Sequence, residues 1–325
     1  MVSKHSALNG RKSWNLLDKR CVKMRNKIIV ILGFDMETDI GSWTPYYKGL
    51  VKGTPKILRV LLRKNLKATF FFTGEAAKKY PNIVREVADA GHEIGCHSLY
   101  HETVGDELFP ILGVKPLLPE EVPIRLKRAT ECVEEALGDR VFSFRAPRLW
   151  GSTLMVRTLE ELGYIADASY PLYYYGEQLV PYHPNRNDWT KKGDMKILEI
   201  PNFADITVKG KDPYGRDRDQ WPLFRTKGAN ALLKHIANFI RYVTSKGLPA
   251  VLCFYFHPWE FIKIPNRPLR VSPEGRVLPD KYLIKNCGSY ALKQLEEVIN
   301  GLLSMGAIFT TAKELAERWD QIESL

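Results

Sequence analysis

The chain has 325 residues, of which 45% are hydrophobic and 26% are charged, and its formal net charge is +11 at neutral pH. These values are ordinary for a globular protein, so they exclude a disordered or fibrous chain, and the length suits one large α/β domain or two small ones. The basic residues are spread along the chain without an arginine-rich arm or zinc-finger spacing, so we do not expect nucleic-acid binding.

The five cysteines are far apart and include no Cys-x-x-Cys pair, which argues against a disulfide scaffold and a cysteine zinc site. No run reaches the roughly 20 apolar residues of a membrane helix, and the N-terminus lacks the apolar stretch of a signal peptide. We therefore expect a cytoplasmic protein with no membrane partner, while no pattern defines an oligomeric state. Residues 1–26 are polar and basic, and we interpret them as an extension before one domain at 27–325.

Strand-like and helix-like segments alternate from residue 27 onwards. The run at 27–34 is short, apolar and rich in β-branched residues, which is typical of a buried parallel strand. The segment at 54–64 opens with Thr-Pro, has apolar residues at helical spacing and ends with basic residues, which predicts a helix. The alternation predicts β-α-β units and a parallel sheet or barrel. Further strands are predicted at 68–72, 92–96, 142–145, 164–166, 196–200, 250–256 and 307–310, and further helices at 81–90, 119–137, 152–162, 229–245 and 290–304.

Long loop-rich stretches at 171–192 and 203–227 carry tyrosine, tryptophan, proline and charged residues. Loops of this length usually serve a function or are disordered.

Three carboxylates, Asp35, Glu37 and Asp39, alternate directly after the first predicted strand. They would lie on one side if the strand continued. Acidic clusters are more often solvated turns, but the carboxyl ends of parallel strands form the active-site face of a β/α barrel. The position therefore favours a functional role.

Two histidines, His97 and His101, follow the strand predicted at 92–96. They are four residues apart, so one helical turn would allow both imidazoles to share a metal ion. We interpret the nearby His92 as a turn residue. A histidine pair on a surface is usually without a metal, but the position of this pair directly after a predicted strand favours a metal site.

Three other strand ends carry side chains suited to chemistry. Arg145 could hold a carboxylate by a bidentate pair or form a structural salt bridge. Asp167 is a further strand-end acid. His257 could act as a general acid near neutral pH, or it could be a strand-end histidine satisfied by a neighbour.

In this order, the motifs resemble those of the NodB-like polysaccharide deacetylases, carbohydrate esterase family four. The resemblance spans about residues 27–315 and is most specific in GHEIGCHSLYH at 91–101, with Arg-Ala-Pro at 145–147 as another element. It implies a distorted (β/α) barrel with about seven parallel strands. It also implies hydrolysis of N-acetyl groups on a carbohydrate, with a divalent metal ion as cofactor and zinc as the expected ion.

The resemblance implies a role for each catalytic candidate. Asp35 resembles the general base, and Arg145 resembles the residue that holds this base. His257 resembles the general acid, and Asp167 the acid that tunes it. These four residues form the predicted catalytic set.

The resemblance also implies a ligand set for the metal. His97 and His101 resemble two ligands. The common first motif has adjacent aspartates, base then ligand, whereas Met36 stands second here, and methionine suits a hard cation poorly. Some members have base and ligand two residues apart, which makes Glu37 the predicted third ligand and Asp39 the reserve candidate.

Departures from the family pattern bear on the substrate. Arg148 replaces the aromatic residue that is usual after Arg-x-Pro, and Pro-Trp-Glu at 258–260 is not the commonest continuation after the late histidine. Several aromatic residues could stack on a sugar, although buried aromatic residues more often belong to the core. The predicted sugar contacts are Trp150, Trp259 and Tyr170, with Trp43 as a further candidate.

Alternative functions remain open. One is an amidohydrolase of the same fold that acts on a small or cyclic amide of the allantoin type, with or without a metal. Another is a carbohydrate-binding protein without catalytic activity. Nucleic-acid binding, suggested by the net charge alone, is the third.

Overall fold

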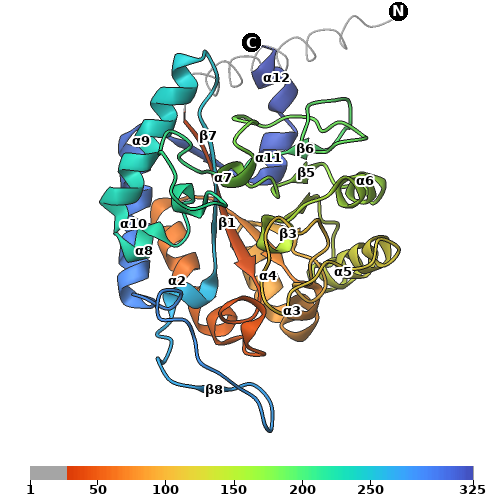
Figure 1. The fold of residues 1–325 in the computed structure, drawn as a ribbon, viewed down its shortest axis with the longest axis vertical. Helices are drawn as coiled ribbons and strands as arrows, with labels where there is room; N and C mark the ends of the chain where they lie inside the picture. Colours follow the sequence, from red (N-terminus) through yellow and green to blue (C-terminus); the bar gives the residue numbers. More distant parts are fainter. Residues whose placement is uncertain (1–27, 325) are drawn as a thin grey trace, which may run out of the picture.

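The computed structural model describes residues 28–324, so the extension predicted at 1–26 lies outside the described residues. Its parallel strands curve into a distorted barrel that is surrounded by helices (Figure 1). This confirms the predicted fold class. The strands are β1 (Ile29–Met36), β2 (Thr69–Phe72), β3 (Glu93–Cys96), β4 (Ser143–Phe144), β5 (Ala166–Asp167), β6 (Leu198–Glu199), β7 (Val251–Phe256) and β10 (Ile308–Thr310).

Strand β1 pairs with three other strands of the barrel. Along one edge it pairs with β7, and along the other its first half pairs with β10 and its second half with β2. The order then runs through β3, β4 and β5 to β6, and a bridge between Asn202 and Cys253 returns to β7. Seven strands therefore surround the barrel, as predicted, and β10 adds an eighth at the amino-terminal end of β1.

The long helices cover the outside of the barrel, which buries every residue of β1, β2 and β7. This two-sided burial explains why these strands are apolar runs without alternation. Within residues 28–324, no helix is long and apolar enough to span a membrane. The predicted helices correspond to α2 (Lys48–Lys64), α4 (Pro81–Asp89), α5 (Glu121–Leu137), α6 (Thr153–Glu161), α9 (Ala229–Ser245) and α10 (Ser289–Ser304), and shorter ones are α3 (Gly74–Lys79), α7 (Leu172–Tyr175), α8 (Leu223–Thr226), α11 (Ala312–Ala316) and α12 (Trp319–Glu323).

Helix α2 differs from its prediction because it begins at Lys48 rather than at residue 54. Thr-Pro has the form of a helix start, yet Pro55 lies inside this helix. The actual start is stabilised by Asp39, whose carboxylate accepts hydrogen bonds from the backbone N–H groups of Lys48 and Gly49. The capping residue is nine positions away in sequence, so local spacing could not identify it.

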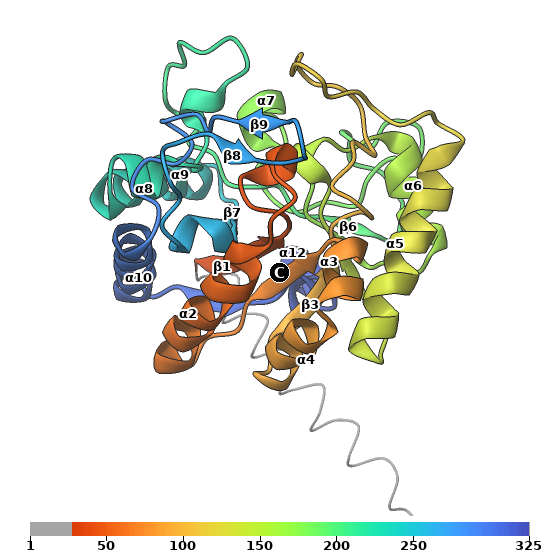
Figure 2. The same ribbon diagram turned by 90° about the horizontal axis from the view of Figure 1, so that it is seen from below.

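A hairpin that the sequence did not predict lies between η4 (Pro258–Phe261) and α10. Its strands are β8 (Leu269–Arg270) and β9 (Arg276–Val277), which pair antiparallel. Figure 1 shows this loop extending beyond the barrel, and Figure 2 shows it near the loop that joins β1 to α2. The predicted loop stretch at 171–192 contains α7, and the stretch at 203–227 contains η3 (Arg216–Arg218) and α8.

Candidate active site

Three buried side chains come together beyond the carboxyl ends of β1 and β3. Glu37 directly follows β1, and His97 directly follows β3, with His101 four residues later. Oε2 of Glu37 lies 2.5 Å from Nε2 of His101 and 3.7 Å from Nε2 of His97. One ligand atom from each residue lies within 4.8 Å of the other two, so one ion could contact all three.

The loop at 97–102 is a tight bend and not the helical turn that the four-residue spacing suggested. Ser98 and His101 both have a left-handed backbone, with φ of 63°. The carboxylate of Glu102 closes the bend by accepting a hydrogen bond from the backbone N–H of Tyr100 at 2.5 Å. The two imidazoles therefore meet through a strained loop, which is a frequent feature of functional sites.

The chemistry of this cluster fits a divalent metal ion. Nδ1 of His97 donates to the carbonyl oxygen of Arg145 at 2.7 Å, because a carbonyl can only accept. Neutral His97 then carries its lone pair on Nε2, as a metal ligand requires. Burial alone would raise the pKa of Glu37, but His101 and His257 hold this pKa well below its usual value. One ionised carboxylate and two imidazoles form a donor set suited to zinc.

Asp39, the reserve ligand candidate, lies outside this cluster. Its Oδ1 accepts from the N–H of Gly49 at 2.7 Å, and its Oδ2 accepts from the N–H of Lys48 at 3.1 Å. Both oxygens are thus engaged with the first turn of α2. The geometry favours Glu37 as the third ligand and makes Asp39 a helix cap.

Asp39→Ala should therefore lower the free energy of unfolding by about 1 kcal/mol, the typical value of a helix cap, and leave the bound metal unchanged. Asp39→Asn, which keeps one acceptor oxygen, should cost less. Chemical denaturation and metal analysis of both variants would measure this. Loss of metal from a folded Asp39→Ala variant would return Asp39 to the ligand set.

Asp35, the predicted base, lies near the end of β1 and is buried. Its Oδ1 accepts a hydrogen bond from Nη1 of Arg145 at 2.8 Å. Its Oδ2 lies 3.9 Å from Nε2 of His257, the predicted acid. The structure therefore brings the predicted base, its arginine and the predicted acid together.

Arg145 is held in a closely fitted position inside the barrel. Its guanidinium donates to the carbonyl oxygens of Ala168 and Phe254, both at 3.2 Å, and lies over the ring of Phe71. Gly33 on β1 makes room for it, because a Cβ atom there would stand 2.2 Å from Nη1. The orientation of Asp35 is therefore set by packing as well as by charge.

His257 directly follows β7 and is paired with a carboxylate that the sequence did not identify. Its Nδ1 lies 3.1 Å from Oε1 of Glu260, whose Oε2 accepts from Nε of Arg225 at 2.6 Å. Burial would lower the pKa of His257, but Glu37 and Glu260 raise it above the ordinary histidine value. The three-residue spacing of His257 and Glu260 was a possible signal, whereas Arg225 lies too far away in sequence.

Asp167 lies at the end of β5, as predicted, but its contacts differ from the prediction. Its carboxylate accepts a hydrogen bond from the Ser169 hydroxyl and interacts with Glu199, and burial raises its pKa to about 6. Nδ1 of His257 is instead engaged by Glu260. This geometry favours Glu260, rather than Asp167, as the carboxylate that would tune His257.

Two of the predicted sugar contacts, Trp150 and Tyr170, are completely buried and do not line the pocket. Trp150 packs edge-on against Phe109, with 5.2 Å between ring centroids. Tyr170 packs against Tyr182 and Trp189 in a separate aromatic cluster. A large aromatic residue after a strand can either contact a sugar or pack in the core, and these two residues pack in the core.

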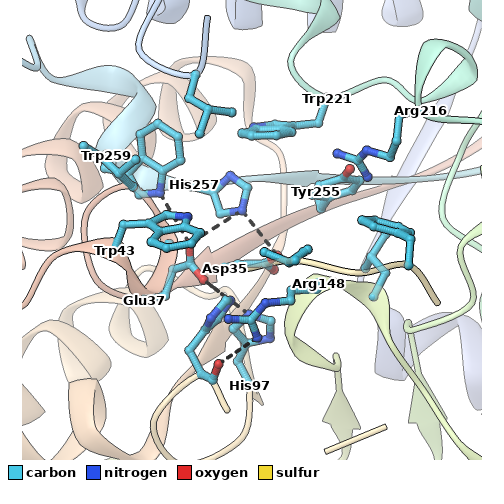
Figure 3. A pocket seen from close by; sticks show the side chains of 17 residues that line it. Asp35, Glu37, Trp43, His97, Arg148, Arg216, Trp221, Tyr255, His257 and Trp259 are labelled. Atoms are coloured by element: carbon cyan, nitrogen blue, oxygen red, sulfur yellow. Dashed lines mark hydrogen bonds and ion pairs between the residues drawn. The ribbon is translucent and has the colours of Figure 1, made fainter. Parts of the chain in front are cut away.

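A pocket of about 240 Å³ is lined by Asp35, His257 and the three predicted metal ligands (Figure 3). Arg145 and Asp167, the other two predicted catalytic residues, do not line it. Trp259 forms one wall: its ring stacks on His257 with 5.3 Å between centroids, and its Nε1 donates to Oε1 of Glu37 at 3.4 Å. Trp43 lines the pocket and remains 46% exposed. Trp43 and Trp259 thus remain candidates for contact with a substrate.

Other pocket residues were not identified from the sequence as site residues. Trp221 lies edge-on to His257 and comes from the loop stretch at 203–227, whose length was the available signal. Arg148 also lines the pocket, and its Nη1 donates to the carbonyl oxygen of His101 at 3.1 Å. The unusual arginine thus supports the loop that carries a candidate ligand.

The fold and site together define a class: a parallel β/α barrel with a candidate Glu-His-His metal site beyond its strand ends. Residues 24–166 match the family model for polysaccharide deacetylase. This match covers less than half of the chain, and over these residues the chain is similar to the polysaccharide deacetylases.

Relatives with known names match parts of the chain. A peptidoglycan-N-acetylglucosamine deacetylase of Bacillus cereus is 45% identical over 76 residues, which is 23% of this chain and 24% of the relative. A chitooligosaccharide deacetylase of Azorhizobium caulinodans is 32% identical over 111 residues, 34% of this chain and 48% of the relative. The chain thus spans less than half the length of either relative.

Solved structures share the fold over nearly the whole chain. A probable polysaccharide deacetylase from Pseudomonas aeruginosa PAO1 superimposes with a TM-score of 0.59 at 14% identity, over 92% of both chains. An allantoinase, PuuE, has a TM-score of 0.58 at 15% identity, over 91% of both chains. At this identity, the likeness establishes the barrel fold alone.

Proposed function

We propose that the protein is a metal-dependent deacetylase that hydrolyses N-acetyl groups on a carbohydrate. The proposal rests above all on one observation: the Glu37, His97 and His101 cluster opens into the same pocket as Asp35 and His257. In Asp35 and in His257, a partner holds one side-chain atom and leaves another facing the pocket. These remaining atoms, Oδ2 of Asp35 and Nε2 of His257, lie 3.9 Å apart.

Glu37, His97 and His101 would hold the divalent ion, expected to be zinc, which when bound lowers the pKa of a water molecule and polarises the acetyl carbonyl. Asp35 takes a proton from the attacking water, because Arg145 engages Oδ1 and leaves Oδ2 toward His257. His257 then gives a proton from Nε2 to the departing amine, since Glu260 engages its Nδ1. The products are acetate and a free amino group.

The carbohydrate class is supported by the family and by the pocket walls. Two of the similar proteins are named as peptidoglycan and chitooligosaccharide deacetylases, and Trp43 and Trp221 offer flat apolar surfaces to a sugar ring. The fold alone is equally compatible with a cyclic amide, as the allantoinase structure illustrates. A complete set of candidate ligands, base and acid argues against a purely carbohydrate-binding role.

His97→Ala and His101→Ala should each remove the metal and abolish acetate release while the barrel stays folded, because the apolar core does not include these side chains. Metal analysis, circular dichroism and acetate release from chitooligosaccharides and peptidoglycan fragments would test this. His183→Ala is a matched control, since His183 pairs with Asp320 away from the pocket.

Stoichiometric metal in both variants would end the ligand assignment. Hydrolysis of allantoin or another cyclic amide, with no acetate released from any of the N-acetylated sugars, would replace the deacetylase by the amidohydrolase of the same fold.

A further inference from the structure

Residues 263–285, here called the hairpin segment, project beside the candidate active site. The segment contains β8 and β9 and begins six residues after His257, at the carboxyl end of β7. Figure 1 shows it reaching beyond the barrel, and Leu283, near its end, lines the pocket. Connections in β/α units are usually two to six residues long, so this one is longer than the fold requires.

The hairpin segment is tied to the catalytic machinery. Arg225, which holds Glu260 through Nε, donates from Nη2 to the carbonyl oxygen of Leu283 at 2.5 Å and from Nη1 to that of Lys285 at 2.7 Å. Near β8, the hydroxyl of Tyr46 donates to the carbonyl oxygen of Arg270. The segment therefore has a defined position at the edge of the pocket.

The charge of the hairpin segment is strongly positive. It carries six basic and two acidic residues, a net charge of +4 out of +11 for the whole chain. In residues 28–324, no ion pair joins any of the six cations to a carboxylate, whereas surface cations such as Lys67 and Arg128 are paired elsewhere. All six are exposed: Lys263, Arg267, Arg270, Arg276, Lys281 and Lys285.

Exposed apolar side chains accompany these cations. Tyr282 is 56% exposed and Leu278 is 62% exposed, both on the hairpin segment, and Trp43 stands at the pocket itself. A cationic surface with flat apolar faces suits a chain of sugar rings that bear acidic groups. The same segment reaches, through Leu283, the pocket in which one N-acetyl group would react.

We propose that the hairpin segment binds the acidic groups of the substrate, which is an N-acetylated polysaccharide that also carries carboxylate groups. This rests on the proposed deacetylase function and adds a substrate class to it. An acidic glycan is favoured over other polyanions because the segment that carries the cations reaches a pocket lined by tryptophans through Leu283, and because the sequence has no nucleic-acid-binding motif.

The test compares two oligosaccharides of equal length: hyaluronan fragments, in which N-acetylglucosamine alternates with glucuronate, and neutral chitooligosaccharides. A triple variant, Arg267→Glu with Arg276→Glu and Lys281→Glu, should lower kcat/KM for the acidic oligomer by about tenfold or more, the range of electrostatic steering. It should change kcat/KM for the neutral oligomer by less than about twofold, and the difference should disappear at high salt.

The matched control reverses three exposed cations: Lys234 and Arg241 on helix α9, and Lys246, the residue that caps its carboxyl end. It changes the net charge equally, so it should leave the preference for the acidic oligomer intact. An unchanged preference in the hairpin variant, or an equal loss in the control, would overturn the proposal. Absence of any preference in the wild-type protein would do the same.

A measurement of oligosaccharide binding tests this inference independently of the proposed function. If neither these oligosaccharides nor peptidoglycan fragments release acetate, the deacetylase proposal fails, and calorimetric titration of the same two oligomers still tests the hairpin segment. Binding of hyaluronan that the hairpin variant loses supports the proposal. Tighter hairpin-dependent binding of single-stranded DNA, or of vesicles that contain phosphatidylglycerol, would overturn the assignment to an acidic glycan.

Discussion

Asp35→Asn should slow acetate release by about two to four orders of magnitude, the usual worth of a general base, and leave the metal content unchanged. An asparagine side chain can still accept the hydrogen bond of Arg145, but it cannot take a proton from water. Because Asp35 is outside the Glu37, His97 and His101 cluster, the ligand set stays complete. Steady-state kinetics together with metal analysis would measure both effects.

Stability has to be followed in the same variant. Arg145 is completely buried, so removing the charge of Asp35 leaves its guanidinium without its counter-ion, which is costly in a protein interior. Thermal unfolding should show a lower midpoint than that of Asp89→Asn, a surface control on α4. Loss of metal from a folded Asp35→Asn protein would show that Asp35 is a ligand and that the roles of Asp35 and Glu37 are exchanged.

The second large effect concerns the proposed acid. His257→Ala should lose about two to four orders of magnitude on an N-acetyl sugar and clearly less on an activated aryl acetate. An amine leaves a tetrahedral intermediate only when it is protonated, whereas an aryl oxide departs readily as an anion. The ratio of the two losses therefore isolates acid catalysis from the functions of the metal and the base.

Glu260→Gln should reproduce this pattern more weakly, by about 10- to 100-fold on the amide, because a hydrogen bond to a charged group is worth about 1.5–3 kcal/mol. Asp167→Asn should not reproduce it, since Glu260 and not Asp167 engages Nδ1 of His257. Equal losses of His257→Ala on both substrates, with metal content confirmed, would make His257 a ligand or a structural residue. An amide-selective loss in Asp167→Asn alone would restore the original assignment.

The sequence by itself predicted parallel strands and the candidate site residues that follow them. Apolar runs without alternation indicated strands buried on both faces, and helices between them required parallel pairing. Parallel strands bring their carboxyl ends to one face, so residues that follow different strands, such as Asp35, His97 and His257, had to lie near one another. For these residues, the position directly after a strand was enough to predict that they lie close together.

The partners of these residues were decided by the tertiary structure. Arg225 binds Glu260 from a distant segment of the chain, and a loop separates Asp39 from the start of α2. Neither contact follows from the periodicity of one helix or strand. Likewise, a strand-end aromatic residue can face the pocket or the core, and packing placed Trp150 in the core. Sequence periodicity defines which side of its own element a residue occupies, but which groups meet it there depends on how all the elements pack.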